Sequence, residues 1–323
     1  MLLGTSILGF SVRFRLGDDI VPYFSIILSL TIGIIDAFLL ILFIHHISTS
    51  IHVSHVILRV SRDLSNAIEK LFPKKLLQAA PLSDLASVKN EVPSGFDQDS
   101  RPIVSSRTGY LQAIDYEYLL GLAQASDVIL RIHPRPGEFI VEDTPLASVW
   151  PASGYTRVLC ARLNDAIFLG YERTLTQDVE FAINQLVEIA VRALSPGIND
   201  PFTAVRCLNR LGQGLIELSK VQWPSQYLYD SNQKVRLIIK TITFPKMVDR
   251  AFNLIRQNGI QSPIVMISLL ETIGAVIPFV HSGEDLAALR LQAELVERGC
   301  RNSIPEEFDR IRVSSAYEAL NVT

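Results

Sequence analysis

The residues with the clearest potential for chemistry lie around the motif SPGINDP at residues 195–201. A helix beginning after this motif would expose free backbone N–H groups, which bind small anions. The motif could therefore be a ligand-binding or catalytic loop. The candidate ligand-binding residues are Arg173, Asp178, Ser195, Asn199, Asp200 and Thr203. No histidine lies nearby in the sequence to activate Ser195, so no catalytic residue is assigned.

A structural turn is the favoured interpretation of the same motif. Asp200 followed by Pro201 is typical of a helix N-terminus, where an N-cap contributes about 1 kcal/mol. The helix before the motif should be capped by Thr174 or Thr176. Asp178 would then lie in its first turn, where the helix dipole favours a carboxylate. The motif would thus join two helices of a hairpin.

A second set of polar residues accompanies an apolar run near the N-terminus. Residues 24–44 form a mostly apolar run about 21 residues long, enough for a helix to cross a bilayer. Asp36 lies near the middle of this predicted span, where it could line an ion path. A packing contact with another helix or a second copy is favoured. Basic residues after the run, including Arg59, Arg62 and Lys70, predict that the C-terminal part lies on the cytoplasmic side of a bacterial inner membrane.

Histidines follow the apolar run at a spacing that could bind a metal. His45, His52 and His55 would lie within about 80° of arc on a helix, which makes them weak metal candidates. No carboxylate or cysteine stands at ligand spacing, so interfacial histidines are favoured over a metal site, and a pH-sensing role is open. The sequence predicts neither a metal nor a cofactor.

The composition narrows the class of partner. A net charge of -3 and a pI near 6.1 provide no large basic field, so nucleic acid is not expected as a partner. The three cysteines lack CxxC spacing, which suits a reducing compartment and argues against a disulfide framework.

The elements that must position these residues indicate an α+β fold that is mainly helical. Residues 1–72 are predicted to hold the membrane anchor and an amphipathic stalk helix, and 73–106 a linker. Residues 107–173 should form a small barrel-like β module, in which 128–149 loosely resemble the half-barrel of biotinyl and lipoyl carriers without their lysine. Residues 174–323 should form a helical domain, with a hairpin at 178–220.

Several stretches carry a family resemblance. They are SPGINDPFTA, FIHHISTSI, RPGEFIVEDTPL and TFPKMVDRAFNLIRQNG. On these motifs the chain resembles a bacterial family of predicted membrane proteins, domain of unknown function 2254. The resemblance implies about four N-terminal spans followed by a cytoplasmic region, and it implies that this chain begins within the third span, as an N-terminally truncated member. The family carries no settled activity to transfer.

Two function classes fit the sequence. The first is a non-enzymatic membrane protein, either a channel-like or transport-associated assembly or a sensor, that contacts the bilayer and could form a homo-oligomer. The alternative is a membrane-tethered enzyme or small-anion-binding protein that uses the SPGINDP loop. An open pocket that brings together Arg173, Asp178, Asn199 and Asp200 would favour the alternative. Burial of all four in hydrogen bonds would favour the first class.

Overall fold

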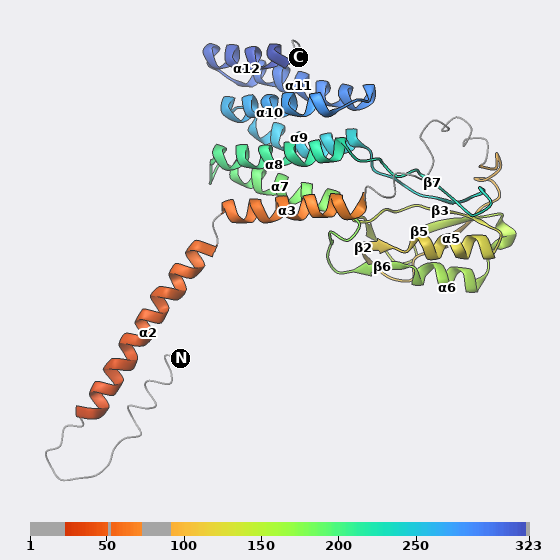
Figure 1. Ribbon diagram of the computed structural model, residues 1–323, viewed down its shortest axis with the longest axis horizontal. Coiled ribbons are helices and arrows are strands. Elements are labelled where there is room, and N and C mark those ends of the chain that lie inside the picture. Colours follow the sequence, from red (N-terminus) through yellow and green to blue (C-terminus); the bar gives the residue numbers. More distant parts are fainter. Residues whose placement is uncertain (1–22, 51–52, 73–91, 321–323) are drawn as a thin grey trace, which may run out of the picture. The chain divides into compact units, whose positions relative to one another are not determined.

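A computed structural model describes residues 23–50, 53–72 and 92–320, and the chain divides into two compact units (Figure 1). The first unit is Met1–Val56 and the second is Ile57–Thr323. Each unit is described by itself. The predictions that rest on residues 1–22 and 73–91 lie outside the described residues.

The first unit consists mainly of helix α2, Tyr23–Ser50. Its apolar side chains at residues 27–43 are largely exposed, and Asp36 among them is half-buried. Within the described part of the chain, no helix has the length and apolar character needed to cross a membrane. The prediction of a membrane span at 24–44 is therefore not borne out.

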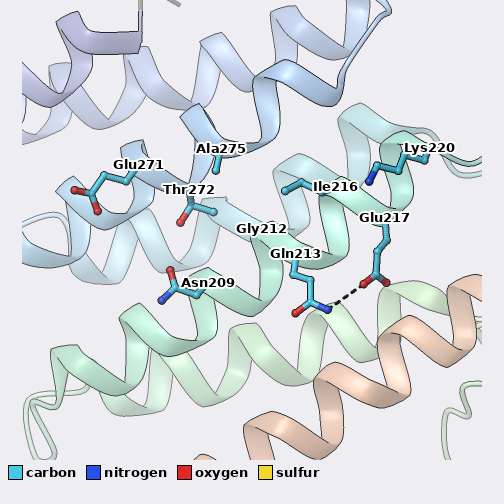
Figure 2. Close-up of a pocket in the computed structure, with 9 residues that line it drawn as sticks. All are labelled: Asn209, Gly212, Gln213, Ile216, Glu217, Lys220, Glu271, Thr272 and Ala275. Atoms are coloured by element: carbon cyan, nitrogen blue, oxygen red, sulfur yellow. Dashed lines mark hydrogen bonds between the residues drawn. The ribbon is translucent and has the colours of Figure 1, made fainter.

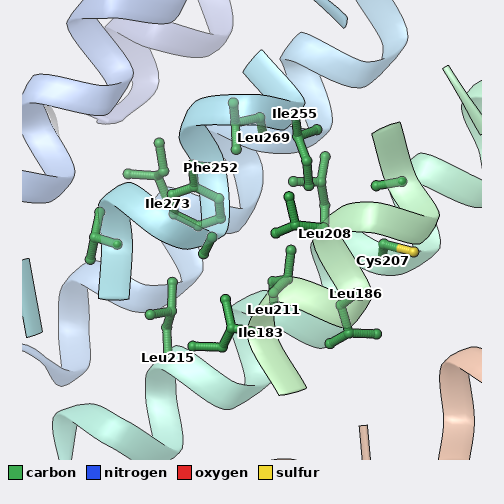
Figure 3. Close-up of a cluster of buried hydrophobic side chains, with 14 of the residues drawn as sticks. Ile183, Leu186, Cys207, Leu208, Leu211, Leu215, Phe252, Ile255, Leu269 and Ile273 are labelled. Atoms are coloured by element: carbon green, nitrogen blue, oxygen red, sulfur yellow. The ribbon is translucent and has the colours of Figure 1, made fainter. Parts of the chain in front are cut away.

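The larger unit contains a bundle of helices around one hydrophobic core (Figure 3). Each helix presents an apolar stripe to this core, and in α10 apolar residues extend nearly all round the helix although Ile264 and Glu271 are exposed. Leu186, Leu208, Phe252 and Ile273 are among its buried side chains. The helices are α3 (Val53–Leu71), α7 (Val179–Ala193), α8 (Pro201–Ser219), α9 (Phe244–Gly259), α10 (Pro263–Val276), α11 (Gly283–Ser303) and α12 (Glu307–Leu320).

Helix α3, which the sequence analysis interprets as a stalk, contributes its apolar stripe to the bundle core. Leu64 is fully buried and packs against Gly214 of α8, where an added Cβ would lie 2.5 Å from the leucine Cδ2. The Ser65 hydroxyl donates a hydrogen bond to Glu217 of α8. The helical spacing of apolar residues in α3 therefore reflects packing against α8 and its neighbours.

The strands form two open sheets over a second, separate hydrophobic core. The five-stranded sheet has the order β1-β5-β3-β8-β7, in which only β3 and β8 are parallel, and the three-stranded antiparallel sheet has the order β4-β2-β6. The strands are β1 (Arg101–Val104), β2 (Gly109–Ile114), β3 (Ile129–Ile132), β4 (Phe139–Ile140), β5 (Pro145–Trp150), β6 (Ile167–Gly170), β7 (Tyr227–Tyr229) and β8 (Val235–Ile238). Short helices α5 (Tyr116–Ala125) and α6 (Arg157–Asp165) accompany them.

These sheets correct the predicted barrel-like module. The described strands do not close on themselves, and β1 comes from the range predicted as linker. Strands β7 and β8 follow α8 in the chain and join the sheet through the parallel pair of β8 with β3. A pairing between segments about a hundred residues apart leaves no local periodicity to detect, which is why the sequence pattern missed it. We call the strands with α5 and α6 the β part, and the bundle the helical part.

Candidate functional site

Arg173 and Asp178 form a buried ion pair where the chain leaves β6 and enters α7. The Arg173 Nε and Nη2 atoms donate to Asp178 Oδ2 at 2.9 and 2.6 Å. The other carboxylate oxygen accepts the backbone N–H of Phe181 at 3.1 Å, so Asp178 is itself the N-cap of α7. The prediction of a threonine cap with Asp178 in the first turn is wrong, because the helix begins one residue after Asp178.

The side chain of Asp178 is almost completely shielded from solvent. Its side chain is 1% exposed, whereas that of Arg173 is 23% exposed. Burial raises the pKa of Asp178, and the hydrogen bonds from Arg173 oppose that rise. Burial therefore disfavours the ionised form of Asp178, and the ion pair with Arg173 stabilises it.

A loop of the β part closes over this pair. Gly137, between β3 and β4, has φ of +91°, and a Cβ at this position would lie 2.2 Å from Asp178 Oδ2 and 2.8 Å from Arg173 Nη2. The backbone of residue 137 therefore lies directly against the ion pair. Only glycine combines this left-handed conformation with so close an approach.

The same loop carries a second ion pair to α7. Arg135 Nη2 donates to Glu180 Oε2 at 2.7 Å, and the Arg250 Nε of α9 lies 3.7 Å from the other oxygen of Glu180. Arg135 also contacts Glu138, which accepts a 2.7 Å hydrogen bond from Lys240. Glu180 is 5% exposed. Within the described structure, the buried Arg135 Nη1 and Glu180 Oε1 have no hydrogen-bond partner.

Together these charges make one feature, which we call the ionic junction. Its members are Arg135, Glu138, Arg173, Asp178, Glu180, Lys240 and Arg250. They come from the β part, from the first turn of α7 and from α9. The two hydrophobic cores are separate clusters within one compact unit, so the ionic junction is a polar contact between the regions around the two cores.

The SPGINDP motif lies at the opposite end of α7 and has a different character. Asp200 is the N-cap of α8, and its oxygens accept the backbone N–H and the hydroxyl of Thr203 at 3.1 and 2.6 Å. These hydrogen bonds from Thr203 lower the pKa of Asp200. The Ser195 hydroxyl donates to the Arg192 carbonyl, and Asn199 adopts a φ of +48° in the exposed turn.

The structure therefore does not gather the candidate residues into one pocket. Arg173 pairs with Asp178 at the N-terminal end of α7, whereas Asn199 and Asp200 follow its C-terminal end. The helix has 15 residues, which separates the two groups by about 22 Å. Ligand binding at either group stays a prediction.

The N-terminal candidates fall partly outside the described residues. Asp36 lies within α2, while the side chains of His45 and His52 are not described. His55 lies in α3. Among the residues that the structure describes, no three histidine, cysteine, aspartate or glutamate side chains are grouped for a metal ion.

Comparison with known proteins places this architecture in a family. The family model described as "Predicted membrane protein", domain of unknown function 2254 (DUF2254), matches residues 1–275. The chain belongs to the DUF2254 family. It is 27% identical over 310 residues to uncharacterized proteins of Mycobacterium bovis and Mycobacterium tuberculosis, covering 94% of this chain and 57% of each relative. No solved structure matches it significantly.

This DUF2254 chain also holds a serine–histidine pair that the sequence analysis missed. His133 Nε2 lies 2.9 Å from Ser148 Oγ, across the antiparallel strands β3 and β5. Burial, followed by the nearby Arg131, lowers the pKa of His133. The residues are 15 apart in sequence, so only the strand register could have revealed the pair. Ser148 lies within a central strand, which favours a structural hydrogen bond over an exposed nucleophile.

Proposed function

We propose that this protein is a non-enzymatic, membrane-associated protein with a sensory or transport-associated role, in which the ionic junction couples the β part to the helical part. The observation that carries the proposal is the meeting of two separate cores at a buried network of ion pairs. A conformational change in the β part would then be transmitted to the helical part through these ion pairs.

The energetics of buried ion pairs suit a coupling role. Removing one partner of such a pair costs about 3–5 kcal/mol, because the other charge is left buried. Glu180 and Asp178 are both nearly inaccessible, so the ionic junction has a well-defined closed arrangement. Arg250 and Lys240 are about half exposed and connect that arrangement to the surface. An element with discrete states is what transmission between two regions requires.

On this proposal α2 contacts lipid. The support is its exposed apolar side chains, among them Phe38 at 60% and Ile41 at 64%, and the description of the family as membrane proteins. On this proposal the C-terminal part lies on the cytoplasmic side of a bacterial inner membrane, because the basic residues Arg59 and Arg62 follow the apolar helix. Asp36 packs against a second copy in a homo-oligomer.

The two tryptophans allow a direct test of the coupling. Trp150 lies in β5 and Trp223 packs against the bundle core, so Trp150→Phe and Trp223→Phe each leave one reporter. Denaturant unfolding of the full chain in detergent should give the same midpoint for both reporters. Adding Glu180→Ala should separate the two midpoints.

The matched control is Glu188→Ala. Glu188 lies on the same helix, is 69% exposed and, among the described residues, pairs with the exposed Arg192 alone. We expect this change to leave the midpoints coincident, because an exposed pair of this kind contributes about 0.5 kcal/mol or less. Separate midpoints with an intact ionic junction, or coincident midpoints with Glu180→Ala, would contradict the coupling.

Membrane association has its own experiment. The double change Phe38→Lys and Ile41→Lys should move the chain from the membrane pellet to the supernatant, since each lysine in hydrocarbon costs about 3 kcal/mol. Leu291→Lys is the control, because Leu291 is 53% exposed on α11 and has no place in lipid on this proposal. If the double variant pellets with the membrane as fully as the control does, the proposal that α2 contacts lipid is wrong.

A further inference from the structure

A groove with polar side chains along its walls lies between α8 and α10, outside the ionic junction (Figure 2). Its volume of about 480 Å³ falls within the range of small-molecule sites. Side chains of Asn209, Gln213 and Glu217 line one wall at successive turns of α8, and Glu271 lies on the α10 side. The groove therefore has walls rich in hydrogen-bond acceptors.

The floor of the groove is apolar and closely packed. Gly212 brings α8 against α10, since a Cβ there would lie 2.6 Å from the Thr272 Cγ2. Ile216 and Ala275 contribute apolar surface beside it. This floor would accommodate the methylene groups of an aliphatic ligand.

Glu217 is held rigidly in the wall. Gln213 Nε2 and Ser65 Oγ both donate to its Oε1, at 3.0 and 3.1 Å. Arg210 Nη1 donates to the side-chain oxygen Oε1 of Gln213 at 3.1 Å, which fixes the orientation of the side-chain amide. The second oxygen of Glu217 takes no hydrogen bond within the described residues. Such a fixed acceptor is prepared for a donor from outside the chain.

The charges of the groove select the class of ligand. Neither Glu217 nor Glu271 forms an ion pair in the part of the chain that the structure describes, and the one cation, Lys220, lies 4.7 Å from the Phe279 ring centroid. We infer that the groove binds an aliphatic polyamine, with its ammonium groups on the two carboxylates and its methylenes on the apolar floor. Ammonium groups supply only donors, which matches walls of carboxylate and amide oxygens.

Isothermal titration of spermidine into the full chain in detergent tests this inference at about 0.15 M salt. We expect saturable binding that weakens about tenfold in Glu217→Gln and in Glu271→Gln, because each removes one charge-assisted contact. Ala275→Phe, which fills the groove without changing its charge, should abolish binding. Glu294→Gln is the matched control, since Glu294 is 58% exposed on α11 outside the groove.

The absence of saturable heat with the parent chain would overturn the inference, and so would full binding by Ala275→Phe. An equal loss of binding in Glu294→Gln would mark a general surface-charge effect and would also overturn it. So would binding of uncharged 1,5-pentanediol as tight as that of spermidine. The groove lies apart from the ionic junction, so these results are independent of the proposed coupling.

Discussion

The two ends of α7 use the same residue type for the same local task in opposite surroundings. Asp178 caps α7 at its N-terminal end, and Asp200 caps α8 just beyond its C-terminal end. Asp178 is 1% exposed, paired with Arg173 and covered by the backbone of Gly137. Asp200 is half-buried and accepts the backbone N–H and the hydroxyl of Thr203 within its own turn.

The difference shows that a capping pattern identifies a helix start but not the importance of the cap. Both aspartates accept a backbone N–H three residues on, which is the local signal that a sequence displays. The neighbours that make Asp178 part of the ionic junction come from other elements. Changes at the Asp178 end should therefore disturb two regions, whereas changes at the Asp200 end should disturb one turn.

The largest expected effect is that of Gly137→Ala. The new methyl group would lie 2.2 Å from the Asp178 Oδ2, in a conformation that costs a non-glycine residue about 1–3 kcal/mol. With the ion pair displaced as well, we expect a loss of about 4 kcal/mol in the free energy of unfolding. Denaturant unfolding of the purified chain measures this.

Gly197→Ala is the matched change in the SPGINDP turn. No atom lies within 4 Å of a Cβ at residue 197, and its φ is not positive. We expect an effect within about 0.5 kcal/mol, since the substitution adds no strain and restricts the unfolded chain slightly. Equal losses for the two alanines would show that the backbone of residue 137 does not press on the ion pair.

A smaller but still clear contrast is expected between Asp178→Ala and Asp200→Ala. The first removes a cap and leaves the Arg173 guanidinium without its carboxylate, for a loss of about 3 kcal/mol. The second removes only a cap, for about 1 kcal/mol. Thermal or denaturant unfolding of both variants under one condition provides the comparison, and a ratio near one would refute the special role of the buried pair.

Much of the helical part could be predicted from the sequence, because its signals are local. The apolar stripes of α7 and α8 and the cap at Asp200 follow from spacing alone, whereas the place of α3 in the bundle core does not. The stripe of α3 was also detected, although its partner Gly214 was not.

The β part and the ionic junction could not be derived in the same way. The pairing of β8 with β3, and the contact of Arg135 with Glu180, join residues that lie far apart in the chain. Arg173 and Asp178 were both chosen as candidates, yet as parts of a loop site with Asn199. Their true neighbour, Gly137, carries no signal beyond being a glycine before a strand.

The smallest expected effect concerns pH, and its sign should differ between the two aspartates. The pKa of Asp200 is lowered in the folded chain by the hydrogen bonds from Thr203, so its stabilisation is present above the ordinary pKa near 3.8 and is lost as the pH falls through the lowered value. The pKa of Asp178 is raised by burial, so the folded state takes up its proton first and gains stability as the pH falls. Relative to Asp200→Asn, the parent chain should lose its advantage as the pH falls from about 5 to below the ordinary value of about 3.8. Relative to Asp178→Asn it should gain over the same interval. The free energies of unfolding of the parent and of the two variants, measured along this pH series, test this contrast. If the difference between parent and variant changes with pH in the same direction for Asp178→Asn and Asp200→Asn, Asp178 and Asp200 share one environment.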